Sequence, residues 1–389
     1  MTKQNQQFDV RMSKPIVVAQ ASPEVKQWGH WQFPSIERLA DGRLHVEFSI
    51  HKDSIVSYGK PVGHAVSDDN GLTWSVPERP DDLEGGLLLA GGDRLKPHAK
   101  VPEKLAERDM QLPKPLGIVD SYGNLRTIYR ASDIPDLYSG RFLRRKRKGE
   151  SQWKVERTKV HFPEETRFTA EGVLPYPSFC RLKAAPDGSL WGLAYPYMPD
   201  ERSGIMRMTP VFFQSDDDGH NWHVQSTIPY RGNSAVDPKQ DDREGFSEPD
   251  IAFMPDGSII GLLRTTDGLG LGPLYSTRSA DNGQTWSRPA LYESFGVWPT
   301  LIVLKSGYTL AAYGRLGLYL NVSNDPEGLR ADRKLVIVPP GEYQKDTCSY
   351  CGLLAIDDHS ILIVYSDFQY PNGDGVPCKT ILVRRITII

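Results

Sequence analysis

The sequence lacks the segments that would indicate a membrane protein or a nucleotide-binding enzyme. None of its apolar runs approaches the roughly 20 residues needed to span a bilayer. The polar stretch 1–14 has no apolar core of the signal-peptide type. No phosphate loop or dinucleotide motif stands between a strand and a helix. We expect a cytoplasmic protein, or a secreted one whose signal peptide has been removed.

An excess of one charge sign and cysteine are also lacking. The 46 basic and 49 acidic residues leave a net charge of −3, which does not favour nucleic acid as a partner. The basic run 141–148 could bind a polyanion, but we expect a solvated strand or hairpin face. Cys348 and Cys351 form a C-x-x-C, but no second pair or nearby histidine completes a zinc set. We expect buried free thiols, no metal and no cofactor.

A hairpin pattern recurs along the chain. Each copy has an apolar strand, a tight turn with Asp-Gly or a similar pair, and a second apolar strand. The copies begin at Phe33, Pro115, Tyr176, Glu248, Trp298 and Tyr350. Four-stranded propeller blades repeat every 40–50 residues or so, and the wider gaps indicate insertions. The pattern predicts six blades.

The ends of the chain indicate how the ring closes. The stretch 14–20 (KPIVVAQ) and the final stretch 379–389 (KTILVRRITII) both read as strands, and their pairing would remove an open sheet edge. We therefore expect one domain over 1–389, with insertions at about 81–113 and 231–245. Such a ring needs no partner to bury its core, and the oligomeric state is left open.

A second repeat follows three of these hairpins. The pattern S-x-D-x-G-x-[TN]-W begins at Ser67, Ser215 and Ser279, and Ser323 begins a decayed copy without the tryptophan. Ser and Asp can satisfy the backbone groups of a turn, Gly can adopt positive φ, and Trp can pack beneath the turn. We expect structural turns without a role in catalysis.

These repeats resemble the Asp-box (BNR-repeat) proteins of the sialidase-like superfamily over nearly the whole chain. The resemblance implies an all-β, six-bladed propeller with a site at the narrow end of its central funnel. The superfamily contains hydrolases, lyases and non-catalytic binding modules, so the fold leaves the function open.

The sialidase pattern also implies roles for single residues. Tyr350 matches the tyrosine nucleophile, Glu248 matches its glutamate partner, and Asp53 falls near the acid/base aspartate. Arg264 matches an arginine that follows the glutamate, and Arg315 is a weaker match to another carboxylate-binding arginine. A glycosidase with two carboxyl groups and a tyrosine is therefore implied.

One position departs from this pattern. Sialidases carry Arg-Ile-Pro in the first inner strand, where this chain has Gln32-Phe33-Pro34. A neutral amide removes a charge-assisted contact to a carboxylate, worth about 1.5–3 kcal/mol. An ordinary sialidase is therefore not expected.

Further candidates lie where inner strands begin or neighbouring strands end, since these points converge on one face of a propeller. His51 ends a strand beside Asp53 and is a catalytic candidate. The expected substrate-binding residues in this group are His30, Arg130, Tyr176 and Trp298, together with Gln32, Arg264 and Arg315. Aromatic rings can stack on sugars, and arginine can bind a carboxylate with two hydrogen bonds.

Three functions fit these residues. The favoured one is an exo-acting glycoside hydrolase that releases a terminal acidic or deoxy sugar from an oligosaccharide. The second is a polysaccharide lyase or a histidine-dependent rhamnosidase-type enzyme on uronate-containing glycans, with His30, His51 or His64 moving the proton. The third is a propeller that binds sugar without catalysis.

Overall fold

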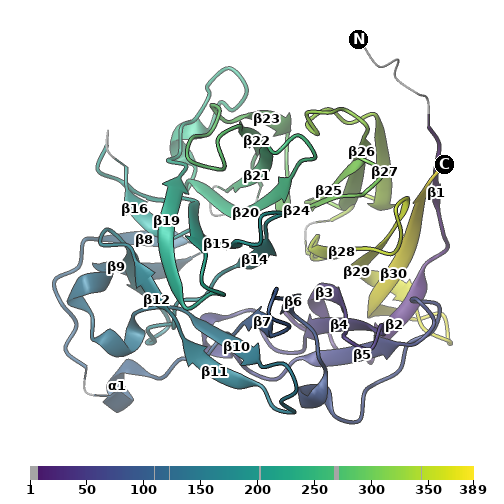
Figure 1. Ribbon diagram of the computed structural model, residues 1–389, viewed down its shortest axis with the longest axis horizontal. Helices are drawn as coiled ribbons and strands as arrows, with labels where there is room; N and C mark the ends of the chain where they lie inside the picture. Colours follow the sequence, from purple (N-terminus) through teal and green to yellow (C-terminus); the bar gives the residue numbers. More distant parts are fainter. Residues whose placement is uncertain (1–7, 109, 122, 201–202, 267–270, 343) are drawn as a thin grey trace.

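The computed structural model describes residues 8–389 except 109, 122, 201–202, 267–270 and 343. Its sheets surround a central axis as the blades of a six-bladed, all-β propeller (Figure 1). In the described chain, helix is limited to α1 (Leu105–Arg108) and short 3-10 turns. No helix in these residues has the length and apolarity to cross a bilayer.

Each blade is an antiparallel sheet whose strands follow one another outward from the axis. Blade 1 consists of β3 (Gln32–Arg38), β4 (Leu44–Ser49) and β5 (Gly63–Ser67), and blade 2 of β6 (Leu87–Leu88), β7 (Arg94–Pro97), β10 (Phe142–Lys146) and β11 (Lys154–Arg157). Blade 3 consists of β14 (Arg181–Ala184), β15 (Leu190–Ala194), β18 (Val211–Ser215) and β19 (Asn221–Thr227), and blade 4 of β20 (Phe246–Phe253), β21 (Ile259–Thr265), β22 (Leu274–Ser279) and β23 (Ala290–Glu293). Blade 5 consists of β24 (Val297–Val303), β25 (Thr309–Gly314), β26 (Leu318–Ser323) and β27 (Arg333–Val338), and blade 6 of β28 (Cys351–Ala355), β29 (Ser360–Pro371) and β30 (Pro377–Ile388). Strand β12 (Lys159–His161) adds to blade 3 in parallel with β19.

The two ends of the chain share blade 6, as expected. Strand β2 (Ile16–Gln20) pairs antiparallel with β30, with Ile16 opposite Val383. Strand β1 (Val10–Met12) continues along the same partner. The last blade is thus completed by residues from both ends, which closes the ring without an open edge at that point.

Blade 2 differs from the expectation. Its inner hairpin is β6–β7, which lies inside the stretch 81–113 that was expected to be an insertion. The hairpin from Pro115 does form, as β8 (Gly117–Ser121) and β9 (Asn124–Arg130), but it pairs with β13 (Thr166–Thr169) in a separate sheet. The two-residue strand β6 is too short to produce a recognisable pattern.

A second small sheet lies beside this one. It consists of β16 (Tyr197–Pro199) and β17 (Met206–Met208), and β8 and β13 neighbour it. We call the two sheets together the accessory sheets. The stretch 231–245 carries one 3-10 turn, Gln240–Asp242, and otherwise runs without regular structure.

The Asp-boxes form the turns that the pattern predicted. In the box of blade 3, Asp217 Oδ1 accepts hydrogen bonds from Ser215 Oγ and from the N–H of Asn221, at 2.8 and 2.9 Å. The N–H of Gly219 donates to Ser215 Oγ. Ser67 and Ser279 begin the same network in blades 1 and 4. Each box closes the turn after the third strand of its blade.

The boxes also seal the contact with the preceding blade. A Cβ added to Gly283, which has φ +73°, would lie 2.3 Å from a ring carbon of Trp191 in blade 3. Glycine is therefore required both by the backbone angle and by the close packing. Trp222 is fully buried and belongs to the apolar core between blades 2 and 3.

Apolar clusters fill the spaces between neighbouring blades, and they differ in size. Large clusters separate blades 2 and 3, 3 and 4, 4 and 5, 5 and 6, and 6 and 1. Between blades 1 and 2 the buried cluster contains Leu39, Val66 and Leu83. This interface is the one with the least apolar material.

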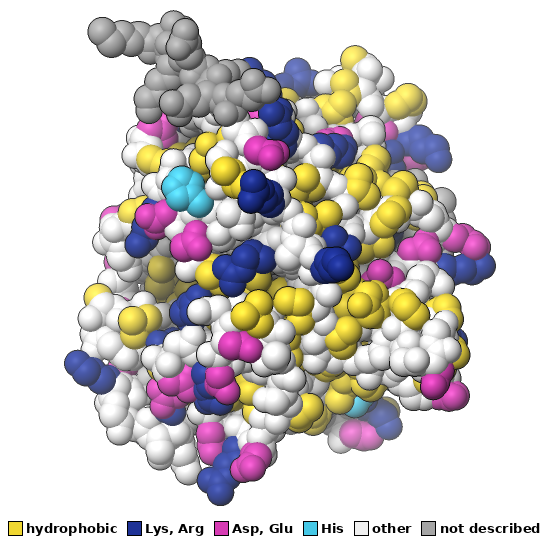
Figure 2. Space-filling model, turned by 90° about the vertical axis from the view of Figure 1, so that its right-hand side faces the viewer, with side chains coloured by type: hydrophobic (Ala, Val, Ile, Leu, Met, Phe, Trp, Pro, Cys, Tyr) yellow, Lys and Arg dark blue, Asp and Glu magenta, His cyan; other side chains and the backbone are white. Residues whose placement is uncertain are grey.

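The flank that carries β1 and β30 shows a mixed surface (Figure 2). Basic and acidic side chains are interspersed there among hydrophobic patches, and neither charge sign dominates this face.

Truncation of the box tryptophans tests how the blades are held together. We expect Trp222→Ala to lower the free energy of unfolding by about 3–5 kcal/mol, since it opens a cavity in a closed core. Trp74 occupies the same position in the box of blade 1 but is half-buried, so Trp74→Ala should cost clearly less. Urea unfolding followed by fluorescence measures both. Equal losses would contradict a role for Trp222 in the interface.

Candidate active site

Three inner strands begin with the same backbone distortion. The pairing register shifts between Gln32 and Ser35, between Ser247 and Asp250, and between Val297 and Thr300. Within these bulges Phe33, Glu248 and Trp298 have φ of 54°, 46° and 44°, and each precedes a proline. A non-glycine residue in this region costs of order 1–3 kcal/mol. The bulges redirect these three side chains toward a common point.

At that point three polar groups from blades 4 and 6 meet. The Tyr350 hydroxyl donates a hydrogen bond to Glu248 Oε1. Arg264 Nη1 donates to the same oxygen at 2.6 Å and lies 3.2 Å from the Tyr350 hydroxyl. The other oxygen, Glu248 Oε2, accepts the backbone N–H of Trp298 at 2.8 Å. Both carboxylate oxygens are therefore paired.

Aromatic rings fix the orientation of Tyr350. Trp298 stacks on it with 4.9 Å between ring centroids and 22° between planes. Phe33 packs edge-on at 4.9 Å. The Arg181 guanidinium lies 4.3 Å from the centroid of Trp298, on which it forms a cation–π contact. The ring is thus held while its hydroxyl points at Glu248.

The electrostatics of this group keep the proton on tyrosine and the charge on glutamate. Burial, and next the negative charge of Glu248, raise the pKa of Tyr350 well above its ordinary value. Burial alone would raise the pKa of Glu248, but the charge and hydrogen bond of Arg264 outweigh it, so the pKa is lowered. Glu248 is therefore an ionised acceptor beside a protonated phenol.

Asp53 lies at the rim of this group. Its Oδ2 accepts the indole N–H of Trp28 at 3.0 Å, and Trp28 packs edge-on against Phe33. Desolvation by the groups around it first, and then the charge of Glu248, raise the pKa of Asp53, although the residue is exposed to solvent. Gly29, with φ +98°, allows this close approach, since a Cβ there would lie 2.2 Å from the backbone nitrogen of Asp53.

Arg315 belongs to the same side of the group. It is buried, donates to the carbonyl of Cys348 at 3.3 Å and lies 5.8 Å from the ring of Trp28. Its positive charge acts on both Asp53 and Tyr350.

A pocket of about 380 Å³ opens beside Glu248, Arg264 and Trp298. Four arginines and two glutamates are the charged residues among those that line it, namely Arg126, Arg141, Arg167, Arg264, Glu165 and Glu248. Glu244 lies behind the wall, hydrogen-bonded to Ser121. With Glu244 included, positive charges still exceed negative ones by one.

The accessory sheets build much of this wall. Arg126 of β9 lies over the ring of Phe168 at 4.9 Å and donates to the Tyr197 hydroxyl at 3.3 Å. Deeper in the wall, Glu165 accepts hydrogen bonds from Arg141 and Arg167, and these two charges lower its pKa to about 2 although burial acts in the opposite direction.

The predicted residues fall into three groups. Glu248, Arg264, Trp298 and Tyr350 form the polar and aromatic group described above, and Asp53 and Arg315 adjoin it at the rim. Tyr176 lines the pocket and donates to Glu103 at 3.2 Å. The remaining four predicted residues, His30, Gln32, His51 and Arg130, do not line the pocket, and neither do Asp53, Arg315 and Tyr350.

Each of these four has its own environment. Arg130 is exposed at the end of β9, because that hairpin belongs to an accessory sheet, and Arg126 faces the pocket in its place. His30 Nδ1 and His51 Nε2 are buried without a hydrogen-bond partner among the described residues. Both amide atoms of the fully buried Gln32 are likewise unpaired there.

Several residues of the site were not anticipated. Trp28 and Arg126 carry no motif, and the basic run 141–148 was expected to be a strand or hairpin face. The run does form a strand, but Arg141, Arg145 and Lys146 are buried in ion pairs with acidic residues. The paired acidic residues lie elsewhere in the sequence, so the run alone did not reveal the pairing.

Comparison with protein-family models and with curated proteins finds no match. Solved structures do match. A protein of unknown function from Dyadobacter fermentans DSM 18053 has a TM-score of 0.63 at 16% identity, covering 98% of this chain and 99% of that one. NanB sialidase from Streptococcus pneumoniae has a TM-score of 0.53 at 13% identity, covering 96% and 70%. A Hadza microbial sialidase has a TM-score of 0.50 at 16% identity, covering 90% and 65%. The chain thus has the sialidase-like fold that its repeats implied.

Substitution of Gln32 tests whether its buried amide is hydrogen-bonded. Its amide gains no hydrogen bond from described residues, so Gln32→Met should leave the free energy of unfolding unchanged or raise it by about 1–3 kcal/mol. Gln214 is the matched control, since this buried glutamine donates to Ser189 Oγ at 3.1 Å. Gln214→Met should therefore destabilise. If urea unfolding shows similar losses for both variants, the Gln32 amide is paired in solution.

Proposed function

We propose that this protein is a retaining, exo-acting glycoside hydrolase that removes a terminal acidic sugar from an oligosaccharide. One observation carries the proposal: the hydroxyl of a half-buried tyrosine donates to an ionised glutamate, and both contact one arginine beside a pocket of sugar size. A tyrosine becomes a nucleophile when a neighbouring base takes its proton. Sialidases occur among the solved structures with this fold, at identities that leave the activity to be tested.

The reaction follows from the protonation states. Tyr350 Oη attacks the anomeric carbon while its proton passes to Glu248 Oε1, and Asp53 protonates the departing glycosidic oxygen. The glycosyl–tyrosine intermediate then reacts with water, which gives a proton to Asp53, and Glu248 returns its proton to Tyr350. Two displacements at the same carbon retain its configuration. Arg264 stabilises the negative charge that moves between Glu248 and Tyr350.

The charge around the pocket favours an acidic sugar. Positive residues outnumber negative ones, and Arg126 is held on the rings of Phe168 and Tyr197 at the pocket wall. A carboxylate in such a pocket is stabilised by charge-assisted hydrogen bonds. A tyrosine nucleophile suits this substrate, since it is neutral before attack and does not repel a nearby carboxylate.

The pocket is not that of an ordinary sialidase. The position implied to hold an arginine is Gln32, whose amide is enclosed. The arginines instead lie on the side of blades 2, 3 and 4. We infer that the carboxylate of the substrate is bound toward Arg126 and Arg264.

A histidine-dependent lyase is the second candidate. It is favoured by His51, whose Nε2 is buried without a partner among the described residues and which lies two positions from Asp53. Against it, the Glu248 carboxylate is paired with Arg264, the Tyr350 hydroxyl and the N–H of Trp298, and not with a histidine. Product mass on a panel of acidic and neutral oligosaccharides separates the two, because hydrolysis adds one water and a lyase yields an unsaturated product. Binding without any product would favour a non-catalytic propeller.

Removal of the nucleophile or of its base should abolish turnover. We expect Tyr350→Phe and Glu248→Gln each to lower kcat/KM by about 10²–10⁴-fold or more, with substrate binding largely retained. The assay is release of the terminal sugar, with binding measured separately by calorimetry.

The chain offers a matched control for this pair. Tyr313 is buried and also donates to a glutamate, Glu293, at 2.6 Å, but Glu293 does not line the pocket, whereas Glu248 does. Tyr313→Phe should lower the stability and leave kcat/KM unchanged. An equal loss of rate in both tyrosine variants would contradict a chemical role for Tyr350.

The pH dependence follows from the two shifted carboxyl groups. Glu248 must be ionised, and its lowered pKa keeps it so until the pH falls below the ordinary carboxylate range. Asp53 must be protonated, and its raised pKa keeps the proton until the pH rises above that range. We expect a bell-shaped profile of kcat/KM with its maximum on the acidic side of neutrality.

A substrate with a good leaving group tests whether Asp53 causes the fall in kcat/KM at higher pH. With an aryl glycoside, which leaves without a proton, Asp53→Asn should retain its glycosylation rate and lose the fall in rate at higher pH. If that fall persists in Asp53→Asn, another group is the acid.

A further inference from the structure

A cluster of polar side chains occupies one face of blade 1. None of its residues takes part in the proposed reaction. His45 and Glu47 are two residues apart on β4 and so point to the same face. Glu37 on β3 is the register partner of His45, and His64 on β5 is the partner of Glu47. Three adjacent strands thus present two imidazoles and two carboxylates together.

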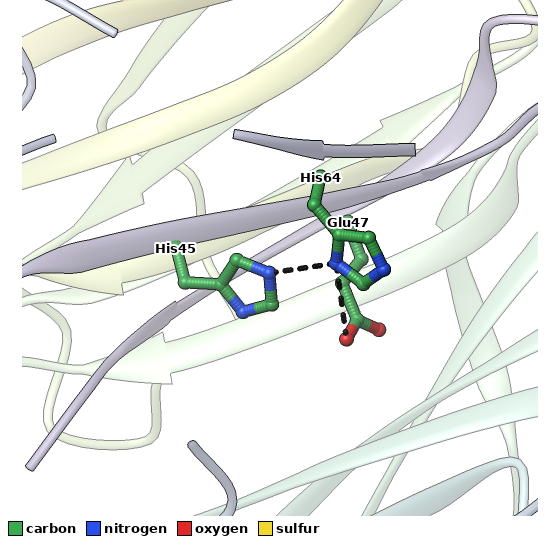
Figure 3. Close-up of side chains that lie close together, drawn as sticks. All are labelled: His45, Glu47 and His64. Atoms are coloured by element: carbon green, nitrogen blue, oxygen red, sulfur yellow. Dashed lines mark hydrogen bonds and ion pairs between the residues drawn. The ribbon is translucent and has the colours of Figure 1, made fainter. Parts of the chain in front are cut away.

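The distances are those of a ligand set. His45 Nε2 lies 3.0 Å from His64 Nδ1, and His64 Nδ1 lies 3.9 Å from Glu47 Oε1 (Figure 3). All three atoms lie within 4.8 Å of one another. Ligand atoms around a tetrahedral Zn²⁺ are about 3.3 Å apart, given bonds of about 2.0–2.1 Å. Small side-chain rotations of the half-exposed Glu47 and of His64 would reach this geometry.

A half-buried carboxylate, Glu37, orients His45 as a ligand. Its ring is 1% exposed, and its Nδ1 lies 2.9 Å from Glu37 Oε1. Glu37 Oε2 accepts the backbone N–H of Gly86 at 2.6 Å, which fixes that carboxylate in turn. The proton of His45 is therefore held on Nδ1, and the lone pair of Nε2 points toward His64. Metal-binding histidines are oriented by such carboxylates.

The surroundings limit the choice of ion. Two imidazoles and one carboxylate suit Zn²⁺ or a similar transition metal and not Mg²⁺ or Ca²⁺, which prefer oxygen ligands. Lys96 and Asp81 are the other charged groups that act on this cluster, with opposite signs. The exposed side of Glu47 leaves room for water as a fourth ligand.

A metal ion bound at this cluster would act beside the interface between blades 1 and 2. The interface between blades 1 and 2 has the smallest apolar cluster of the ring, three buried residues. Glu37 links blade 1 to blade 2 through Gly86, at this same interface. A metal held by His45, Glu47 and His64 would join β4 to β5 and immobilise the histidine that Glu37 supports.

We propose that His45, Glu47 and His64 form a structural Zn²⁺ site, supported by Glu37, that stabilises the contact between blades 1 and 2. The site is independent of the pocket beside Glu248.

The test is Zn²⁺ binding by the full chain after treatment with a chelator. We expect one Zn²⁺ per chain to be retained through gel filtration, a rise in the melting temperature with Zn²⁺, and no rise with Mg²⁺ or Ca²⁺. Co²⁺ in its place should give the visible absorption of a tetrahedral site with nitrogen and oxygen ligands. His64→Ala and Glu47→Gln should lose the retained ion and the rise in melting temperature.

A second pair of histidines supplies the control. His161 and His223 are exposed strand partners on β12 and β19. His223→Ala should behave like the wild-type chain. The proposal is overturned if Zn²⁺ is not retained by the wild-type chain, if His64→Ala retains it as well as the wild type does, or if His223→Ala abolishes binding. Circular dichroism of each variant checks that it is folded, and Glu47→Gln replaces His64→Ala if the latter is not.

Discussion

The candidate site depends on a backbone distortion that is repeated at the start of three inner strands. In a regular strand, alternate side chains would enter the two faces of the blade and join the apolar cores between blades. The bulges at Phe33, Glu248 and Trp298 interrupt this alternation with a left-handed residue. Side chains from blades 1, 4 and 5 can therefore meet Tyr350 of blade 6 at the axis, and strand pairing resumes two residues later.

The buried carboxylate of Glu248 is tolerated at this point because both of its oxygens accept hydrogen bonds. Burying an uncompensated charge would cost several kcal/mol or more. Glu248 receives Arg264, the Tyr350 hydroxyl and the backbone N–H of Trp298. That backbone group is available because the bulge removes Trp298 from the strand ladder. The same distortion thus aims the side chain of Trp298 at Tyr350 and supplies a donor to Glu248.

Much of this could be predicted from the sequence, because local chemistry specifies it. The Asp-boxes are set by side chains within one turn and were predicted as turns. The bulges were not predicted, although a proline follows each left-handed residue, at Phe33-Pro34, Glu248-Pro249 and Trp298-Pro299. Ring closure followed from two strand-like ends. The assignment of blade 2 failed because β6 has two residues, whereas the accessory hairpin has the stronger strand pattern. Arg126 and Trp28 were missed because tertiary contacts, not spacing, bring them to the site.

The accessory sheets build much of the pocket wall, whereas the ring carries the tyrosine, glutamate and arginine. Two insertions supply strands of the accessory sheets: β8 and β9 lie between β7 and β10 of blade 2, and β16 and β17 lie between β15 and β18 of blade 3. They place Arg126 and Tyr197 in the pocket wall. The tyrosine, glutamate and arginine, in contrast, come from inner strands or the strands beside them. Tyr350, Glu248 and Arg264 are therefore held by the ring, where the bulges and blade cores restrict them. Much of the charge and shape of the pocket comes from segments outside the ring, which can change without disturbing its closure. A propeller built this way can keep the groups at its axis while the pocket around them changes, which is consistent with Gln32 in place of an arginine and with Arg126 on an accessory strand.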